Sequence, residues 1–174
     1  AELSDKFDLP ILAGGWFYQL GRDEELLKSN LELGARLGSI VHNTQIFWEH
    51  AERRPVTNEE VMAIYLTASE WGDKTGCRPT FEVHINMWSE DFRRVEVVAD
   101  MVKSRGVDFR MTLDHSHVIF KIDNEAEHEL FELGKALEAK EVDLHPDKPG
   151  NVCQNWIDRN FVQHCHARAA VPNN

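Results

Sequence analysis

Three short apolar segments of the chain each end in side chains that can bind a metal ion. They are residues 81–86 (FEVHIN), 110–117 (RMTLDHSH) and 161–166 (FVQHCH). A divalent cation is held in a protein by deprotonated oxygen and nitrogen donors in a fixed geometry, and carboxylate and imidazole groups supply both kinds of donor. The leading hypothesis from the sequence is therefore a metal site.

The composition of the chain excludes several classes of partner. Among 174 residues, 19 are basic and 30 acidic, which gives a formal net charge of −11 and no basic patch for nucleic acid. The chain is 42% hydrophobic, as in an ordinary globular domain, and has no apolar run long enough for a membrane span. The N-terminal residues lack the pattern of a signal peptide, and three cysteines at these spacings fit neither a disulfide framework nor a zinc finger. We therefore expect a cytoplasmic protein.

Strand-like and helix-like segments alternate along the whole chain. Strands are expected near residues 9–16, 39–47, 81–86, 110–117 and 161–166. Helices are expected at residues 24–37, between Thr57 and Gly76, across Val95 to Val102, and at residues 125–137. Thr57 and Glu60 form a capping-box pattern at the start of the second helix, and Gly76 is placed to end it. The alternation predicts five parallel strands joined by right-handed crossovers.

Two α/β architectures fit five such units, an open doubly wound sheet and part of a (β/α)8 TIM barrel. A barrel collects every strand end around one centre, whereas an open sheet is expected to carry a Gly-rich phosphate loop after its first strand. Gly14-Gly15 is too short for that loop, and polar or aromatic residues follow nearly every expected strand, namely Trp16, His42, Asn43, His84, Asn86, Asp114, His117, His164 and His166. We expect a single domain, residues 1–174, that forms an incomplete TIM barrel.

The three ligand-bearing segments resemble those of the xylose isomerase-like TIM-barrel superfamily, which includes sugar-phosphate isomerases and epimerases. FEVHIN is similar to the fifth strand, LDHSH to the sixth with its D-x-x-H pattern, and QHCHAR to the seventh. The resemblance implies that Glu82, Asp114 and His166 bind a divalent metal ion (Mn²⁺, Mg²⁺, Co²⁺ or Zn²⁺). By this register the chain covers about strands three to seven, and the family's fourth ligand, a Glu on strand eight, has no counterpart.

The resemblance also implies a metal-dependent isomerase or epimerase that acts on a sugar or sugar derivative. Such enzymes remove a proton next to a carbonyl, and the cation stabilises the resulting enediolate. Glu82 and His117 are then the candidate catalytic residues. The expected partner is a small carbohydrate bound by His84, Asn86, His117, His164, Arg168, Trp16 and His42. A homo-oligomer or a partner segment that completes the barrel is also expected.

Alternatives stay open for both the residues and the function. Glu82 can lie in an internal salt bridge, Asp114 can cap a turn, and Arg168 can form an ordinary ion pair. The alternative functions are a metal-dependent lyase or dehydratase on a keto-sugar or inosose, and a non-catalytic partner subunit of a barrel enzyme. An apurinic endonuclease is disfavoured because the chain is acidic and carries too few ligands for a three-metal cluster.

Overall fold

Each strand of the protein's sheet pairs in parallel with the strand that follows it in the chain. The structure is a computed structural model and describes residues 2–172. The five strands are β1 (Ala13–Tyr18), β2 (Val41–Ile46), β3 (Arg78–Glu82), β4 (Met111–Asp114) and β5 (Val162–His166), in the order β1-β2-β3-β4-β5. The prediction of an α/β fold with five parallel strands is confirmed.

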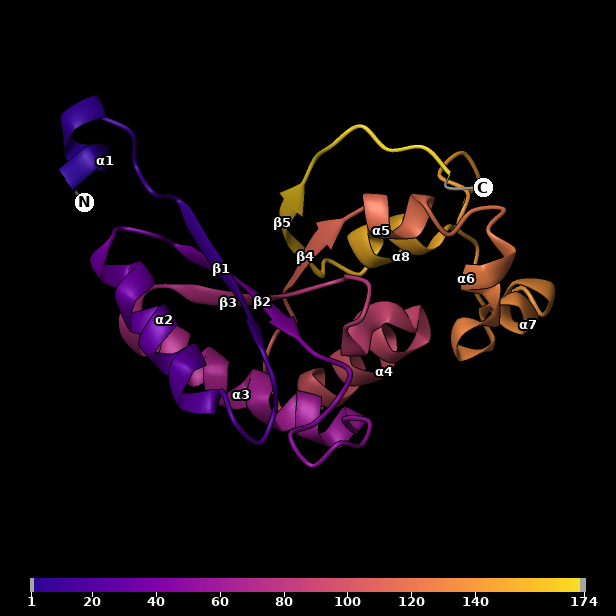
Figure 1. Cartoon of the computed structure of the whole chain (residues 1–174), viewed down its shortest axis with the longest axis horizontal. Coiled ribbons are helices and arrows are strands. Elements are labelled where there is room, and N and C mark those ends of the chain that lie inside the picture. The colour runs from indigo at the N-terminus through magenta and orange to yellow at the C-terminus, as the bar shows by residue number, and fades with distance from the viewer. Residues whose placement is uncertain (1, 173–174) are drawn as a thin grey trace.

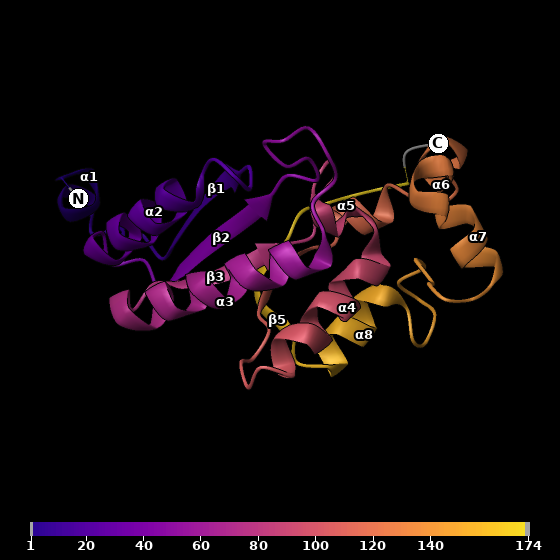
Figure 2. The same cartoon turned by 90° about the horizontal axis from the view of Figure 1, so that it is seen from below.

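Each of the first three strands is followed in the chain by one of the longer helices. They are α2 (Glu24–Arg36), α3 (Asn58–Thr75) and α4 (Phe92–Lys103). α2 packs against α3 and α3 packs against α4, so the helices form one layer on one side of the sheet (Figures 1 and 2). The shorter helices are α1 (Glu2–Phe7), η1 (Trp88–Glu90), α5 (Ser116–Ile119), α6 (Glu125–Glu129), η2 (Leu130–Glu132), α7 (Leu133–Glu138) and α8 (Val152–Asp158). None of the helices among the described residues combines the length and the apolar character needed to cross a membrane.

Local signals define the ends of α3. The Thr57 side chain accepts a hydrogen bond from the backbone of Glu60, and the Glu60 carboxylate accepts one from the backbone of Thr57. Gly76 then ends the helix with a φ of 87°, a conformation that glycine adopts without a steric penalty. The predicted capping box and stop signal are both confirmed.

The apolar core lies between the helices and the sheet. Leu31 of α2, Tyr65 of α3 and Val98 of α4 are buried in one cluster with Phe81 and Met111 of the strands. Burying one such side chain stabilises a fold by about 1.5–3 kcal/mol. The helix layer is therefore fixed to one face of the sheet.

The opposite face of the sheet is polar, although most of it is buried. Because side chains alternate along a strand, the neighbours of the core residues point away from the helices. The Oγ1 atoms of Thr80 and Thr112 lie 2.7 Å apart on this face. Its other buried members are Asn43, Gln45, Glu82 and Asp114. The sheet therefore carries a row of hydrogen-bonding groups that the apolar core does not use.

A β-bulge interrupts the pairing of the last two strands. Met111 pairs with Val162, but the next residue, Thr112, pairs with His164, so Gln163 is an extra residue in β5. Asp114 consequently pairs with His166. The bulge thus sets which side chains of β5 face the polar side of the sheet.

The structure corrects several boundaries predicted from sequence. The third strand ends at Glu82, and the chain then turns through Asn86, whose φ is 60°, into η1. The helix expected at residues 125–137 is broken, because Phe131 and Glu132 have φ values of 54° and 56°. The Phe131 carbonyl accepts a hydrogen bond from Arg93 at 2.6 Å, a tertiary contact that competes with the helix. Helices α1 and α8 were not predicted.

Candidate metal centre

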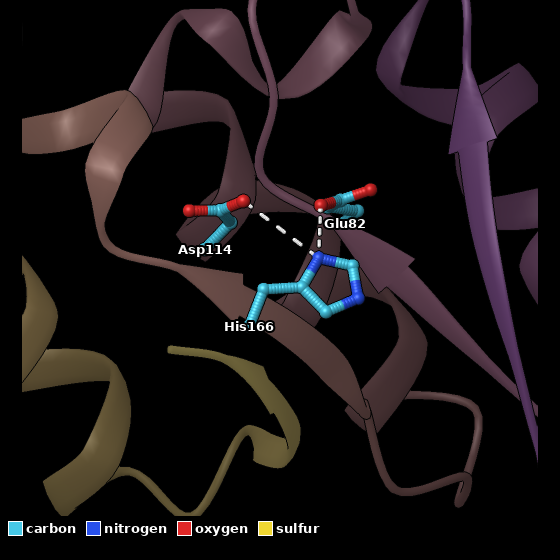
Figure 3. A group of neighbouring side chains, drawn as sticks. All are labelled: Glu82, Asp114 and His166. Atoms are coloured by element: carbon cyan, nitrogen blue, oxygen red, sulfur yellow. Dashed lines mark hydrogen bonds and ion pairs between the residues drawn. The ribbon is translucent and has the colours of Figure 1, made fainter. Parts of the chain in front are cut away.

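Three side chains from three consecutive strands converge at one edge of the sheet. Glu82, Asp114 and His166 are the last residues of β3, β4 and β5, and parallel strands bring their carboxyl ends to the same edge. One ligand atom from each residue lies within 4.8 Å of the others (Figure 3). Nδ1 of His166 is 2.9 Å from Oε1 of Glu82 and 3.7 Å from Oδ2 of Asp114. The structure therefore brings together the three residues that were predicted as metal ligands.

Glu82 is buried and is bound by two amides of the neighbouring strand. Its side chain is 1% exposed, and its Oε2 atom accepts a hydrogen bond from Nδ2 of Asn43 at 2.7 Å. Nε2 of Gln45 donates to the same oxygen. The sequence analysis placed Asn43 at the end of an expected strand but missed Gln45. The signal was available, because Gln45 follows Asn43 by two residues and so shares its face of β2.

Asp114 is also fully buried, and three groups compensate its charge. Its Oδ1 accepts hydrogen bonds from the backbone of Ser116 at 3.1 Å and from the Ser116 hydroxyl at 2.6 Å. Arg168 donates to Oδ2. Burial raises the pKa of Asp114, but Ser116, His117 and Arg168 outweigh that effect and leave the pKa below its ordinary value. The turn cap and the ion pair weighed as alternatives from the sequence are thus both present beside the cluster.

The residues at this edge fit a divalent cation. Two carboxylate groups that are 1% and 0% exposed lie in contact with one imidazole, and buried charges are costly unless they are paired or bind a metal. Two oxygen donors and one nitrogen donor suit Mg²⁺ and Mn²⁺ as well as Co²⁺ and Zn²⁺. The three residues can hold such an ion.

Two further histidines lie next to the cluster. The ring of His117 packs against that of His84, with centroids 4.0 Å apart. Nε2 of His117 is buried and 3.6 Å from Oδ2 of Asp114, too far for a hydrogen bond, and it has no hydrogen-bond partner among the described residues. Burial lowers the pKa of His117 to about 4. His84 is half-buried and its Nδ1 is 2.7 Å from the carbonyl oxygen of Ile85.

His164 lies on the same face of β5 as His166. The two rings are 5.1 Å apart, and Nδ1 of His164 is 3.3 Å from Oγ1 of Thr112. Burial, together with the neighbouring His166, lowers the pKa of His164. His164 is therefore adjacent to the cluster and is hydrogen-bonded to the polar face of the sheet.

The structure does not bring His42, Trp16 and Asn86 to the cluster, although the sequence grouped them with it. His42 faces the helices, where its Nε2 is 2.7 Å from the Tyr18 hydroxyl, and burial lowers its pKa to about 4. Trp16 is 56% exposed on the edge strand β1, where it lines an apolar groove of about 450 Å³ beside α2. Asn86 is exposed in the loop after β3. All three were assigned to the substrate site on the assumption that residues at every strand end face the same central cavity.

Comparison with known proteins gives a relationship at the level of the fold. No family model matches the sequence, and no match was found among curated proteins. Among solved structures, the chain is similar to the apo form of 3-keto-D-glucoside 4-epimerase from E. coli, with a TM-score of 0.53 and 12% sequence identity. The match covers 98% of this chain and 75% of that chain. The α/β arrangement is therefore shared with a sugar epimerase.

Proposed function

We propose that this chain belongs to a divalent-metal-dependent epimerase or isomerase that acts on a sugar or sugar derivative. The observation that carries the proposal is the convergence of Glu82, Asp114 and His166 from consecutive strands. The fold adds support, because a structurally similar protein is an epimerase of a keto-sugar. The cluster supports the metal dependence in this proposal, and the fold supports the class of substrate.

The sheet is read as five consecutive units of a xylose isomerase-like (β/α)8 barrel. Strands that advance in chain order, with α2, α3 and α4 in one layer outside them, are what successive barrel units produce. A doubly wound sheet would instead reverse its strand order and place helices on both faces. In the barrel reading, the polar face of the sheet is the interior, and the cluster lies at the carboxyl end where barrel active sites lie.

The residues of the cluster have separate roles in this proposal. Glu82, Asp114 and His166 hold the cation, which when bound polarises the carbonyl group of the substrate and increases the acidity of the adjacent C–H bond. His117 can accept or return a proton at Nε2, which has no other partner among the described residues. Asp114 lies 3.6 Å from that atom, so its carboxylate would stabilise the protonated ring. His117 therefore acts as the proton-transfer group.

Side chains around the cluster would orient the sugar. The half-buried ring of His84 packs edge-on against Phe17, which is 40% exposed and gives an apolar surface beside polar groups. His164 can donate to or accept from a hydroxyl group. Arg168 can hold a carbonyl or carboxylate oxygen of the substrate, since its side chain is 55% exposed. Such a mixture of an apolar face with convergent polar groups is typical of small-molecule sites.

Hydrogen exchange next to the carbonyl tests the proposal directly. The protein is stripped of metal, reloaded with Mn²⁺, Mg²⁺, Co²⁺ or Zn²⁺, and incubated with a 3-keto-glucoside in D₂O. We expect NMR to show replacement of a C–H proton beside the carbonyl and formation of an epimer or isomer of equal composition. Glu82→Gln should retain the fold by circular dichroism and lose the exchange.

Two results would redirect or overturn this proposal. Loss of a water molecule from the substrate would identify a dehydratase, which uses the same proton abstraction and then expels a leaving group. If no exchange occurs with any of the four metals and no saturable metal binding is found, the proposal is overturned. The remaining alternative is then a non-catalytic partner subunit of a barrel enzyme. His117→Asn should abolish exchange while retaining metal binding, because that residue is not in the ligand set.

A further inference from the structure

The two oxygens of the Glu82 carboxylate have different partners. Oε2 accepts hydrogen bonds from the side-chain amides of Asn43 and Gln45, both on β2. Oε1 is 2.9 Å from Nδ1 of His166, another member of the cluster of possible ligands. The carboxylate is therefore held by one oxygen and directed toward the cluster by the other.

The orientation of both amides follows from the charge that they face. An ionised carboxylate only accepts hydrogen bonds, so the NH₂ groups of Asn43 and Gln45 face Glu82 and their carbonyl oxygens point away. These two carbonyl oxygens are buried and lack a hydrogen-bond partner among the described residues. A buried acceptor without a partner is unfavourable for folding. Stabilisation of the fold alone therefore does not explain why two amides, rather than apolar side chains, occupy this part of β2.

The neighbouring strand leaves room for this arrangement. Gly15 of β1 pairs with Asn43, and a Cβ atom at Gly15 would lie 3.1 Å from Cβ and 3.2 Å from the carbonyl oxygen of Asn43. Both distances are tighter than ordinary contacts between side chains. The glycine thus allows β1 and β2 to lie close together where Asn43 reaches Glu82.

We infer that Asn43 and Gln45 are positioning residues for metal binding, which act through Glu82. Two hydrogen bonds fix Oε2 and leave Oε1 as the oxygen that Glu82 offers to the cation. The inference deepens the proposed function and depends on it for the cation. It also separates two roles that the sequence analysis gave to Glu82, because two amides hold Oε2 and a bound cation would take up the negative charge of Oε1, which makes the carboxylate a weak base. Glu82 is a ligand, and proton transfer belongs to another group.

A double-mutant cycle on Mn²⁺ affinity tests this inference without measuring activity. The wild-type protein, Gln45→Met, Glu82→Gln and the double variant are titrated with Mn²⁺ by calorimetry, and Asn43→Leu is carried through the same cycle. Loss of a hydrogen-bonding group behind a metal ligand typically weakens metal binding by about 10- to 100-fold. We expect that loss for each amide variant in the wild-type background and less than a further twofold loss in the Glu82→Gln background.

A spectroscopic readout separates positioning from general destabilisation. Infrared difference spectra, metal-loaded minus metal-free, report whether a carboxylate binds through one oxygen or two. We expect the wild-type protein to show the wide band splitting of one-oxygen binding, and Gln45→Met combined with Asn43→Leu to show a narrower splitting. Gln154→Met is the matched control, because Gln154 lies in α8, outside the sheet, and its side chain contacts Asp158.

The outcomes distinguish this inference from the proposed function. Mn²⁺ affinity within twofold of wild type in both amide variants, or an equal loss in the Glu82→Gln background, overturns the positioning role. Mn²⁺ binding with the expected coupling but no hydrogen exchange on keto-sugars overturns the proposed function and leaves the positioning role supported. Absence of Mn²⁺ binding by the wild-type protein overturns both.

Discussion

The guanidinium group of Arg168 donates a hydrogen bond to Oδ2 of Asp114. The side chain of Asp114 is fully buried, whereas that of Arg168 is 55% exposed. The same oxygen lies 3.7 Å from His166, so the arginine brings a positive charge to the edge of the ligand cluster. In the metal-free protein this charge offsets part of the cost of burying two carboxylates.

Replacement of Arg168 by Met should strengthen metal binding and weaken the metal-free fold. Removing a positive charge beside the cluster lowers its repulsion of a cation, and we expect Mn²⁺ to bind about tenfold more tightly. The same change leaves Asp114 with one partner fewer and should lower the free energy of unfolding by about 1–2 kcal/mol. Calorimetric titration and thermal melts with and without Mn²⁺ measure both effects.

Arg22→Met is the control for this substitution. Arg22 pairs with Asp23 at a position that is 62% exposed, so its removal should change neither quantity measurably. Weaker Mn²⁺ binding by Arg168→Met would contradict the prediction and would mean that Arg168 orders the ligands rather than opposing the cation.

The buried His42 predicts a pH dependence of stability. Burial lowers the pKa of His42 from 6.5 to about 4. Between pH 6.5 and pH 4, the imidazole is therefore protonated in the unfolded chain and neutral in the folded chain. The stability that comes from keeping His42 neutral is fully present above pH 6.5 and is lost as the pH falls toward 4. It amounts to about 2 kcal/mol of lost stability between pH 7 and pH 5. Urea unfolding across this range should show a shallower slope for His42→Gln than for the wild-type protein.

Tyr18→Phe separates burial from hydrogen bonding at His42. It removes the 2.7 Å contact to Nε2 but keeps the ring covered, so it should lower stability at every pH and preserve the wild-type slope. If His42→Gln kept the full slope, the pH dependence would belong to other groups.

The N-terminus of α3 should be stabilised by the Glu60 carboxylate. Arg54 donates to it at 2.6 and 3.0 Å, and these hydrogen bonds lower the pKa of Glu60 from 4.5 to about 2. Glu60→Gln should cost about 1 kcal/mol at pH 7. Because the pKa is lowered, this stabilisation is present above pH 4.5 and is lost as the pH falls toward 2. Chemical unfolding at pH 7 and pH 2.5 measures the difference.

Glu59→Gln is the matched control for Glu60. It removes the same charge one residue earlier and leaves the capping box intact. An effect of Glu59→Gln equal to that of Glu60→Gln would show that charge at the helix start matters more than the specific contact.

Gly72 of α3 should not tolerate a side chain. A Cβ atom there would lie 2.7 Å from Cδ of Pro79 and 3.0 Å from the carbonyl oxygen of Cys77, so the helix would have to move away from β3. Gly72→Ala should lower the free energy of unfolding by about 1–3 kcal/mol. Gly134→Ala in α7, where the nearest atom is 3.4 Å away, should be neutral or slightly stabilising, and urea unfolding compares the two.

Sequence patterns predicted the parts of the fold that follow short-range rules. The capping box at Thr57, the stop at Gly76 and the alternation that gives five parallel strands all depend on residues near one another in the chain. The break at Phe131 does not, since it involves a hydrogen bond from Arg93, which lies 38 residues away. Contacts of that kind have no signature in a local window of sequence.

The meeting of Glu82, Asp114 and His166 could be predicted because parallel strands share one edge for their carboxyl ends. The direction of His42 could not, since β2 has polar side chains on both of its faces and alternation alone does not identify the helix side. His84 and Asn86 were assigned to the substrate site because they lie two and four residues after Glu82, on the same face if the strand continued. That rule ends with the strand, and the positive φ of Asn86 reverses the chain there.

The extra residue Gln163 in β5 makes the chemistry of the cluster depend on strand register. Were all five residues of β5 paired regularly from Val162 onward, Asp114 would stand opposite Cys165, and a thiol would replace the imidazole. Sulfur ligands favour softer cations than the Mg²⁺ and Mn²⁺ that oxygen and nitrogen donors accept. A slip of one residue, with no change in any side chain, would therefore be enough to alter which metals the cluster could hold.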